Sequence, residues 1–340
     1  MKTNTQNLLQ IIGSPFIEES RELPKVDLDE LHEYSKQNRM PLLYLKSILE
    51  LGVKDNYYEG SLKLIDQWSD IEKRIKKVTN ILDLENVEYA TFKSIKPYRE
   101  VTVDIDLLIY DKYELTVSKL KEEGYILLEK GPLSSTFRDP EVRIDYDIYD
   151  EVGVSYIIYY DKDKVKQTIC DKSLQSGELI KSLTPVNDLL AVIAHSVIKE
   201  QMYILAEYYS TLFFLKNMDN EQLDDFIEMA EKLKLKNAVQ AHIGITHYMH
   251  NQIHGQTPDQ LEKIVSVFGV NQFEIERLQK TGMNMPHKFN MRTLSKSFYE
   301  KMWEGKARRS YLSQFLHMLD PRFLADFIPK FLSHVQRKTY

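Results

Sequence analysis

The sequence predicts an α+β protein with a small mixed β-sheet core, a helical N-terminal lead-in and a large all-helical C-terminal region. Apolar residues recur with helical spacing through the lead-in. Short segments rich in strand-forming residues follow, and helical spacing returns at Thr184-Pro185 and continues from there. We therefore expect three parts. Residues 1–80 form a lead-in that packs on the core, residues 81–180 form the α+β core, and residues 181–340 form a helical C-terminal domain.

The elements of the lead-in and core follow from local patterns. A helix begins near Val26–Leu31, where early acidic residues favour the positive end of the helix dipole, and Leu64–Ile81 continues with helical spacing. Val87–Phe92 and Val101–Tyr110 have the composition of strands, and Asp111–Glu123 that of a helix. Further strands are expected at Tyr125–Glu129, Ser134–Phe137 and Val142–Tyr149, with Val154–Tyr160 as an additional candidate.

The C-terminal region has the start and stop signals of a series of helices. Thr184 is a suitable N-cap, because Pro185 would then occupy the first helical position. Helices are expected over residues 185–216, 220–233, 236–252, 258–266, 271–280, 291–304, 307–318 and 321–336.

The composition indicates a globular protein without a membrane span. Hydrophobic residues are 43% and charged residues 28% of 340 residues, which is enough chain for two domains or for one domain with a long extension. The single cysteine, Cys170, excludes an intrachain disulfide and fits a reducing compartment. No segment approaches 18 consecutive apolar residues, and the N-terminus lacks a signal-peptide pattern, so we expect a cytoplasmic location.

Charge is unevenly distributed along the chain. The net charge of −6 argues against nonspecific binding of nucleic acid by the whole surface. Residues 301–340 nevertheless contain eight Lys or Arg residues against three Asp or Glu, whereas residues 139–151 contain six acidic residues and one arginine. The basic C-terminal helices either present a solvated face or steer a nucleic acid or another anionic acceptor.

Two carboxylates inside an apolar strand are the most informative feature. Asp104 and Asp106 alternate with valine, isoleucine and leucine, so both side chains project from one face, roughly 6–7 Å apart. Like charges at that distance repel unless a cation lies between them, and a hard ion such as Mg²⁺ prefers oxygen ligands. The alternative is a solvated strand face that carries acids. Two further Asp-x-Asp strings lie outside the strands and are expected to be structural, since Asp27/Asp29 opens a helix and Asp161/Asp163 lies in a charged turn before one.

A second strand repeats this arrangement at Asp145 and Asp147. If the two strands are neighbours, a third carboxylate can reach the same ions. Three carboxylates on adjacent strands suit two-metal phosphoryl transfer, in which one ion activates a hydroxyl and the other neutralises the phosphates.

The segment from Phe92 to Ile109, which includes Lys93-Ser94 and Asp104-Ile105-Asp106-Leu107-Leu108, resembles the signature of the DNA polymerase β nucleotidyltransferase superfamily. That signature is a Gly-Ser turn, an Asp-x-Asp strand about ten residues later and a third acidic strand. The likeness is closer to the uncharacterised nucleotidyltransferases of bacteria and archaea. It covers roughly residues 20–220, with the lead-in segment 36–45 and the later segment 194–201.

The resemblance implies transfer of NMP from an NTP to an acceptor hydroxyl or phosphate, with release of pyrophosphate and dependence on Mg²⁺ or Mn²⁺. Asp104 and Asp106 would be the metal pair. Asp145 would be the third carboxylate, with Asp147 as the rival choice. The implied nucleotide-binding residues are Lys93, Ser94, Arg99 and Lys199.

One departure from the signature keeps a second function open. Lys93 replaces the glycine that would let backbone amides approach phosphate. With the basic C-terminus, this departure suggests a decayed transferase fold that binds nucleotide or RNA. A toxin that modifies tRNA or protein is a separate, third alternative. The acceptor (tRNA or other RNA, protein or a small molecule), the NTP, with ATP among the candidates, and the oligomeric state are not identified.

Several other residues attract a functional interpretation. His195, Lys199 and Tyr203 share a face of the predicted helix 185–216, where Lys199 either contacts phosphate or acceptor or belongs to an ordinary helix face. Gly13-Ser14 is a Gly-Ser pair without a strand-borne acidic pair behind it. Four histidines invite a zinc assignment but fit a polar helix face better, because zinc ligands usually come from more than one element; they are His242, His247, His250 and His254.

Overall fold

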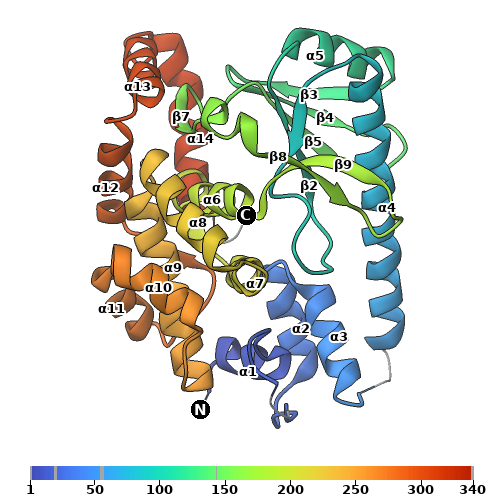
Figure 1. The fold of residues 1–340 in the computed structure, drawn as a ribbon, viewed down its shortest axis with the longest axis vertical. Helices are drawn as coiled ribbons and strands as arrows, with labels where there is room; N and C mark the ends of the chain where they lie inside the picture. The colour runs from blue at the N-terminus through green and yellow to red at the C-terminus, as the bar shows by residue number, and fades with distance from the viewer. Residues whose placement is uncertain (1, 19–20, 54–56, 143, 338–340) are drawn as a thin grey trace.

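The protein has the predicted α+β class. The computed structural model describes residues 2–18, 21–53, 57–142 and 144–337. One mixed sheet occupies one half of the molecule and a large group of helices the other half, with the N-terminal helices beneath both (Figure 1). Arg143 of the predicted strand 142–149 lies outside the described residues.

The sheet places the two acidic strands side by side. Its strand order is β3-β4-β5-β2-β1-β9-β8, with β2 parallel to β5, β1 parallel to β9 and the other neighbours antiparallel. The strands are β1 (Tyr89–Thr91), β2 (Asp104–Ile109), β3 (Ile126–Lys130), β4 (Ser134–Arg138), β5 (Asp145–Tyr149), β8 (Ile169–Ser173) and β9 (Leu179–Leu183).

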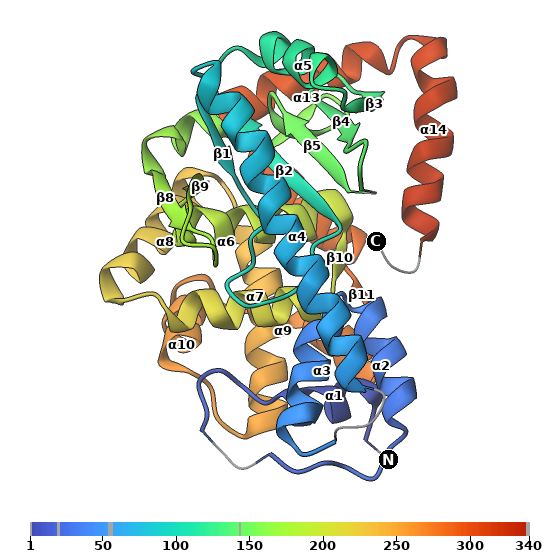
Figure 2. The same ribbon diagram turned by 90° about the vertical axis from the view of Figure 1, so that its right-hand side faces the viewer.

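One face of the sheet is covered by α4 (Tyr57–Leu84) and α5 (Tyr113–Glu122) (Figure 2). Alternation along β2 sends Ile105, Leu107 and Ile109 into the core beneath these helices. The opposite face therefore carries Asp104 and Asp106 toward the helical half of the molecule.

The lead-in helices α1 (Asn4–Ile12), α2 (Leu28–Gln37) and α3 (Pro41–Glu50) share a hydrophobic core with the C-terminal helices, whereas α4 packs on the sheet. The lead-in is thus divided between two cores. The C-terminal helices are α6 (Pro185–Ala194), α7 (Leu205–Lys216), α8 (Asn220–Lys232), α9 (Lys236–His254), α10 (Asp259–Phe268), α11 (Gln272–Lys280), α12 (Met291–Lys301), α13 (Gly305–His317) and α14 (Pro321–Gln336).

Two expectations about the elements were wrong. The hairpin β8–β9 was not predicted, although it forms one edge of the sheet. The single helix expected over 185–216 is interrupted: α6 passes into a π-helical segment, His195–Glu200, and the chain then turns at Gln201 with φ 56°. Residues Met202–Tyr203 form the short strand β10, paired with β11 (His287–Lys288), before α7 begins.

Local hydrogen bonds explain this interruption. Oγ of Ser196 lies 2.8 Å from the backbone oxygen of Met202 and 2.7 Å from the Glu207 carboxylate, and these contacts close the turn between the two helices. The spacing of apolar residues does not reveal such a turn, because apolar residues continue on both sides of it.

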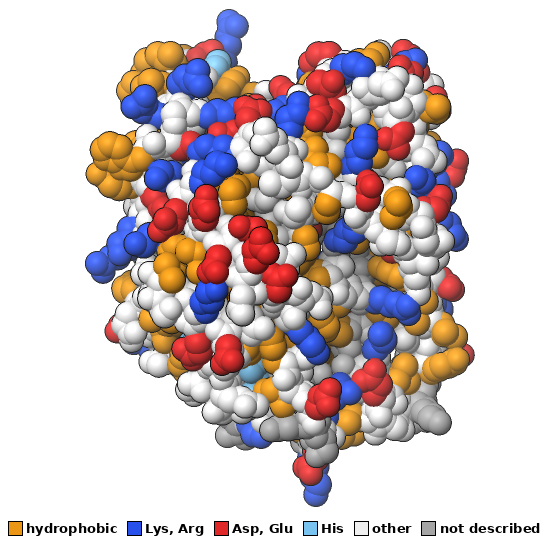
Figure 3. Space-filling view, viewed as in Figure 1, with side chains coloured by type: hydrophobic (Ala, Val, Ile, Leu, Met, Phe, Trp, Pro, Cys, Tyr) orange, Lys and Arg blue, Asp and Glu red, His pale blue; other side chains and the backbone are white. Residues whose placement is uncertain are grey.

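The surface carries interspersed basic and acidic side chains on the face shown in Figure 3, and apolar side chains gather over α13. Leu312, Phe315 and Leu316 are among the exposed apolar residues there. Within the described part of the chain, we find no helix with the length and apolar character that crossing a membrane requires.

Candidate functional site

The parallel pairing of β2 with β5 brings the four strand carboxylates together. Asp104 lies opposite Asp145 in the register, and Asp106 lies opposite Asp147. Because side chains alternate along both strands, all four project from the same face of the sheet. The adjacency that the sequence pattern required is therefore present.

Asp145 and Asp147 have different surroundings on that face. The Asp145 carboxylate accepts two hydrogen bonds from the Arg138 guanidinium, at 2.8 and 3.0 Å, across the β4–β5 ladder. Asp147 instead accepts from the Thr136 hydroxyl at 2.6 Å and from the Tyr149 hydroxyl at 3.3 Å. The structure thus leaves Asp147 with neutral partners and pairs Asp145 with a cation.

Electrostatic coupling also groups Asp147 with the pair on β2. Burial, followed by repulsion from Asp106, raises the pKa of Asp104 to about 7 and raises the pKa of Asp147 above its usual value. Burial opposes ionisation of Asp106 too, but Lys93 and His195 outweigh it and hold the pKa of Asp106 below its usual value. Repulsion among these three carboxylates is what a bound cation would relieve.

Lys93 supplies a cation within the protein. Its Nζ atom lies 3.0 Å from Oδ1 of Asp106 and 3.1 Å from Nδ1 of His195. Its backbone has φ 61°, a left-handed conformation that glycine adopts at least cost. The backbone N–H of Lys93 donates to the buried Asp188 carboxylate at 2.6 Å, which holds the turn against α6.

Ser94 is buried beneath this turn. Its hydroxyl accepts the backbone N–H of Asp106 at 2.6 Å and donates to the backbone oxygen of Phe92 at 3.1 Å. Ser94 therefore fixes the strand that carries Asp106. Because its hydroxyl is engaged with backbone atoms, it is not positioned for the expected contact with a triphosphate.

The π-helical segment contributes the opposite wall of the site. Lys199 donates to the Tyr149 hydroxyl at 3.1 Å, and Nε2 of His195 lies 3.3 Å from the Glu200 carboxylate. Burial, with Lys93 and Lys199 nearby, lowers the pKa of His195 to about 4, so the ring is neutral near pH 7. π-Helical turns frequently occur at functional sites. Tyr203 does not join this wall, because its hydroxyl is buried against Thr246.

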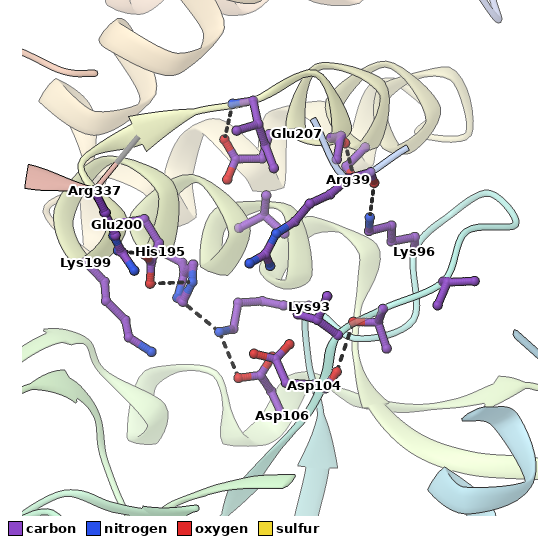
Figure 4. A pocket seen from close by; sticks show the side chains of 17 residues that line it. Arg39, Lys93, Lys96, Asp104, Asp106, His195, Lys199, Glu200, Glu207 and Arg337 are labelled. Carbon is purple, nitrogen blue, oxygen red and sulfur yellow. Dashed lines mark hydrogen bonds and ion pairs between the residues drawn. The ribbon is translucent and has the colours of Figure 1, made fainter. Parts of the chain in front are cut away.

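A pocket of about 230 Å³ lies between the sheet and the helical half (Figure 4). Asp104 and Asp106 line it on one side and the π-helical segment on the other, and an arginine from the lead-in projects between them. The ionisable lining residues that sequence reasoning missed are Arg39, Lys96, Glu200, Glu207 and, as a pocket residue, Arg337, which pairs with Glu200. Their local sequence gives no signal, because they converge from distant segments.

Arg99 does not reach this pocket. Its guanidinium lies over the Trp68 ring of α4, 5.3 Å from the ring centroid, and the side chain is exposed. Strand alternation cannot place Arg99, because residues 95–103 form a loop between β1 and β2.

The donors of the site fit Mg²⁺ or Mn²⁺ in part. Carboxylate oxygens are suitable ligands, and Mg²⁺ is often held by one or two carboxylates together with substrate phosphates. Among the described residues, however, no three His, Cys, Asp or Glu side chains are arranged to hold a metal ion. Asp104 and Asp106 would therefore hold an ion jointly with the substrate, after Lys93 had withdrawn from Asp106.

The histidines of α9 have structural partners. Oγ1 of Thr211 lies 2.9 Å from Nε2 of His242, His247 contacts Glu262, and Nε2 of His250 lies 2.8 Å from the Ser14 hydroxyl. The last contact also explains Ser14, which serves the packing of the lead-in. The polar helix face that the sequence favoured is wrong for His242 and His250, which are buried, while His247 and His254 are partly exposed.

The other basic residues of the C-terminal helices are divided between ion pairs and solvent. Lys306 pairs with Glu151 and Asp163 of the core, whereas Arg308, Arg309 and Arg322 are exposed. The side chain of Lys330 and residue Lys338 lie outside the described part.

Comparison with known proteins does not assign the chain to a family. No protein-family model matches the chain, and no curated protein matches it.

Proposed function

We propose that this protein is a nucleotidyltransferase that moves NMP from an NTP to an acceptor hydroxyl or phosphate and releases pyrophosphate. The observation that carries the proposal is the pocket in which Asp104 and Asp106 face Lys93 and Lys199. Carboxylates for a divalent ion and cations for phosphates are the two groups that phosphoryl transfer requires.

The Lys93 backbone supports the same proposal. Lys93 stands where the superfamily signature has glycine, and its φ of 61° is a conformation that glycine prefers. The turn thus retains the shape that a glycine would give it, although the side chain supplies charge where the glycine would allow close approach.

The chemistry we propose is an in-line displacement. An acceptor oxygen forms a bond to the α-phosphorus, the bond from that phosphorus to the α,β-bridging oxygen breaks, and pyrophosphate leaves with that electron pair. A divalent ion, when bound, would lower the charge on the phosphates. Lys93 and Lys199 would bind phosphate oxygens. The proton of an acceptor hydroxyl would pass to Asp147, whose partners are neutral, and not to Asp145.

The test is pyrophosphate release from each of the four NTPs, with Mg²⁺ or Mn²⁺ and with total RNA and a metabolite extract as acceptors. Release that depends on metal and on one NTP, and that disappears in Asp104→Asn and Asp106→Asn, is the expected result. Equal release by wild type and both variants would overturn the proposal. When the NTP carries a label in its nucleoside monophosphate part, the labelled product then shows whether the acceptor is tRNA, other RNA, protein or a small molecule.

A binding module is the second candidate, and one contact favours it. The Lys93 ammonium lies against Asp106, where a divalent ion would otherwise bind. In this reading the carboxylates are neutralised permanently, and the pocket binds nucleotide or RNA without turnover. Tight NTP binding that does not change with Mg²⁺, together with no pyrophosphate release, is the result expected of it.

A further inference from the structure

Arg39 occupies a backbone position that glycine normally fills. It directly follows Asn38, the C-cap residue of α2, with φ 55°. The N–H of Arg39 donates to the Lys36 oxygen (3.0 Å) and the N–H of Met40 donates to the Ser35 oxygen (3.0 Å). This is the hydrogen-bond pattern of a left-handed helix cap, at which glycine has no steric cost.

The strained turn is fixed by contacts from two other regions. The Asn38 side-chain oxygen accepts the N–H of Leu205 (3.2 Å), and the Asn38 backbone oxygen accepts the N–H of Ala206 (3.1 Å), at the start of α7. Lys96, in the β1–β2 loop, donates to the backbone oxygen of Arg39 at 3.3 Å. A backbone outlier that its surroundings hold in place is a reason to look for function.

The Arg39 side chain enters the pocket that contains the acidic pair. Figure 4 shows it pointing from the lead-in into the cavity, across from Asp104 and beside Lys93. Arg39 also acts electrostatically on Asp104, since it is one of the charges that lower the pKa of that carboxyl against the effect of burial. The lead-in therefore contributes a guanidinium to a site whose other lining residues all come from segments after residue 92.

We propose that Arg39 is a substrate-binding residue that holds the polyphosphate of the nucleotide, together with Lys93 and Lys199. The identity of the ligand rests on the proposed function. A guanidinium can bind two phosphate oxygens at once, which a lysine cannot. Arg39 thereby fills the role of a charge-balancing arginine that the sequence pattern suggested for Arg99.

The chain offers a matched control at the end of α8. Lys234 is also a long cation with positive φ (53°), and its cap has the same two hydrogen bonds, Lys234 N–H to the Glu231 oxygen and Leu235 N–H to the Ala230 oxygen. Lys234 does not line the pocket. Replacing Arg39 or Lys234 by glycine relieves the same backbone conformation, but only the first replacement removes a pocket side chain.

The experiment measures binding of inorganic tripolyphosphate and of ATP by calorimetry, with and without Mg²⁺, for wild type, Arg39→Gln, Arg39→Gly, Arg39→Lys and Lys234→Gly. We expect Arg39→Gln and Arg39→Gly to weaken tripolyphosphate binding by about tenfold or more, and Arg39→Lys to weaken it less. Lys234→Gly should bind as wild type does, and neither glycine variant should have a lower Tm than wild type.

Wild-type affinity in both Arg39→Gln and Arg39→Gly would overturn the inference. So would weakened binding in which both variants also have a clearly lower Tm, because Arg39 would then be structural. Polyphosphate binding that requires Arg39 in a protein that never releases pyrophosphate would remove the proposed transferase function and leave the inference standing. Pyrophosphate release that is unchanged in Arg39→Gly, measured at NTP concentrations below KM, would remove the inference about Arg39 and leave the transferase function standing.

Discussion

The Nζ atom of Lys93 lies 3.0 Å from Oδ1 of Asp106, and the two side chains are only 9% and 6% exposed. A buried ion pair of this kind is sensitive to the loss of one partner, because the remaining charge stays out of water. In this protein the pair also lies where a divalent ion would bind. In the proposed function, binding of metal and substrate would therefore compete with a contact that stabilises the fold.

Replacement of Lys93 should make stability depend on divalent ions. Without them, we expect Lys93→Met to lower the free energy of unfolding by about 3 kcal/mol, because Asp106 loses its cation. Added Mg²⁺ should then raise the Tm of Lys93→Met more than that of wild type, which thermal unfolding with and without EDTA would measure. The double variant Lys93→Met/Asp106→Asn should show neither effect, and equal Mg²⁺ shifts in wild type and Lys93→Met would contradict this account.

The two acidic residues of β5 should differ in their effect on turnover. We expect Asp147→Asn to lower kcat by at least about a hundredfold, as for loss of a proton acceptor in the site. Asp145→Asn breaks only the half-exposed pair with Arg138, so it should change kcat several-fold at most and the free energy of unfolding by about 1 kcal/mol or less. Steady-state kinetics of both variants decides the assignment, and the opposite order of effects would restore Asp145 as the third carboxylate.

Glu100 should connect the lead-in to the core. Its buried carboxylate accepts the backbone N–H groups of Leu42 (3.2 Å) and Leu43 (3.0 Å) at the start of α3, and that of Val101 (3.0 Å). Glu100→Ala would leave these donors without an acceptor, so we expect the free energy of unfolding to fall by about 2–3 kcal/mol in urea titrations. The control is Glu33→Ala on the exposed surface of α2, which should shift it by about 0.5 kcal/mol or less.

Acid should destabilise the protein through His242. Burial lowers the pKa of this histidine to about 3, so in mildly acidic solution the unfolded chain is protonated at this residue and the folded protein is not. Stability should therefore fall as the pH drops from about 6.5 toward 3, by roughly 2 kcal/mol at pH 5 from this residue alone. His254, with a pKa lowered to about 4 by burial, adds to the effect.

The measurement is urea unfolding between pH 7 and pH 4.5 for wild type and His242→Gln, which can keep the hydrogen bond to Thr211. The slope of stability against pH should be smaller in the variant by up to one proton. An unchanged slope would mean that His242 is protonated in the folded protein as readily as in the unfolded chain.

The α+β class and the elements of the core up to β5 were predictable because their periodicity is local. Alternation along β2 placed Asp104 and Asp106 on one face of their strand, and the same period in β5 placed Asp145 and Asp147 on one face of theirs. The parallel pairing of the two strands puts all four side chains on the same face of the sheet. The hairpin β8–β9 escaped prediction, because its short strands contain charged residues and carry little alternating pattern.

The sequence by itself determined the class of the fold and the positions of the carboxylates, since both depend on the repeat of neighbouring residues. Only the tertiary structure decided which partners those carboxylates have. Arg138 takes Asp145 because β4 lies beside β5, and Arg39 reaches the pocket because α2 ends against α7 and the β1–β2 loop. Contacts between segments so far apart in the chain depend on packing, and no local period records them.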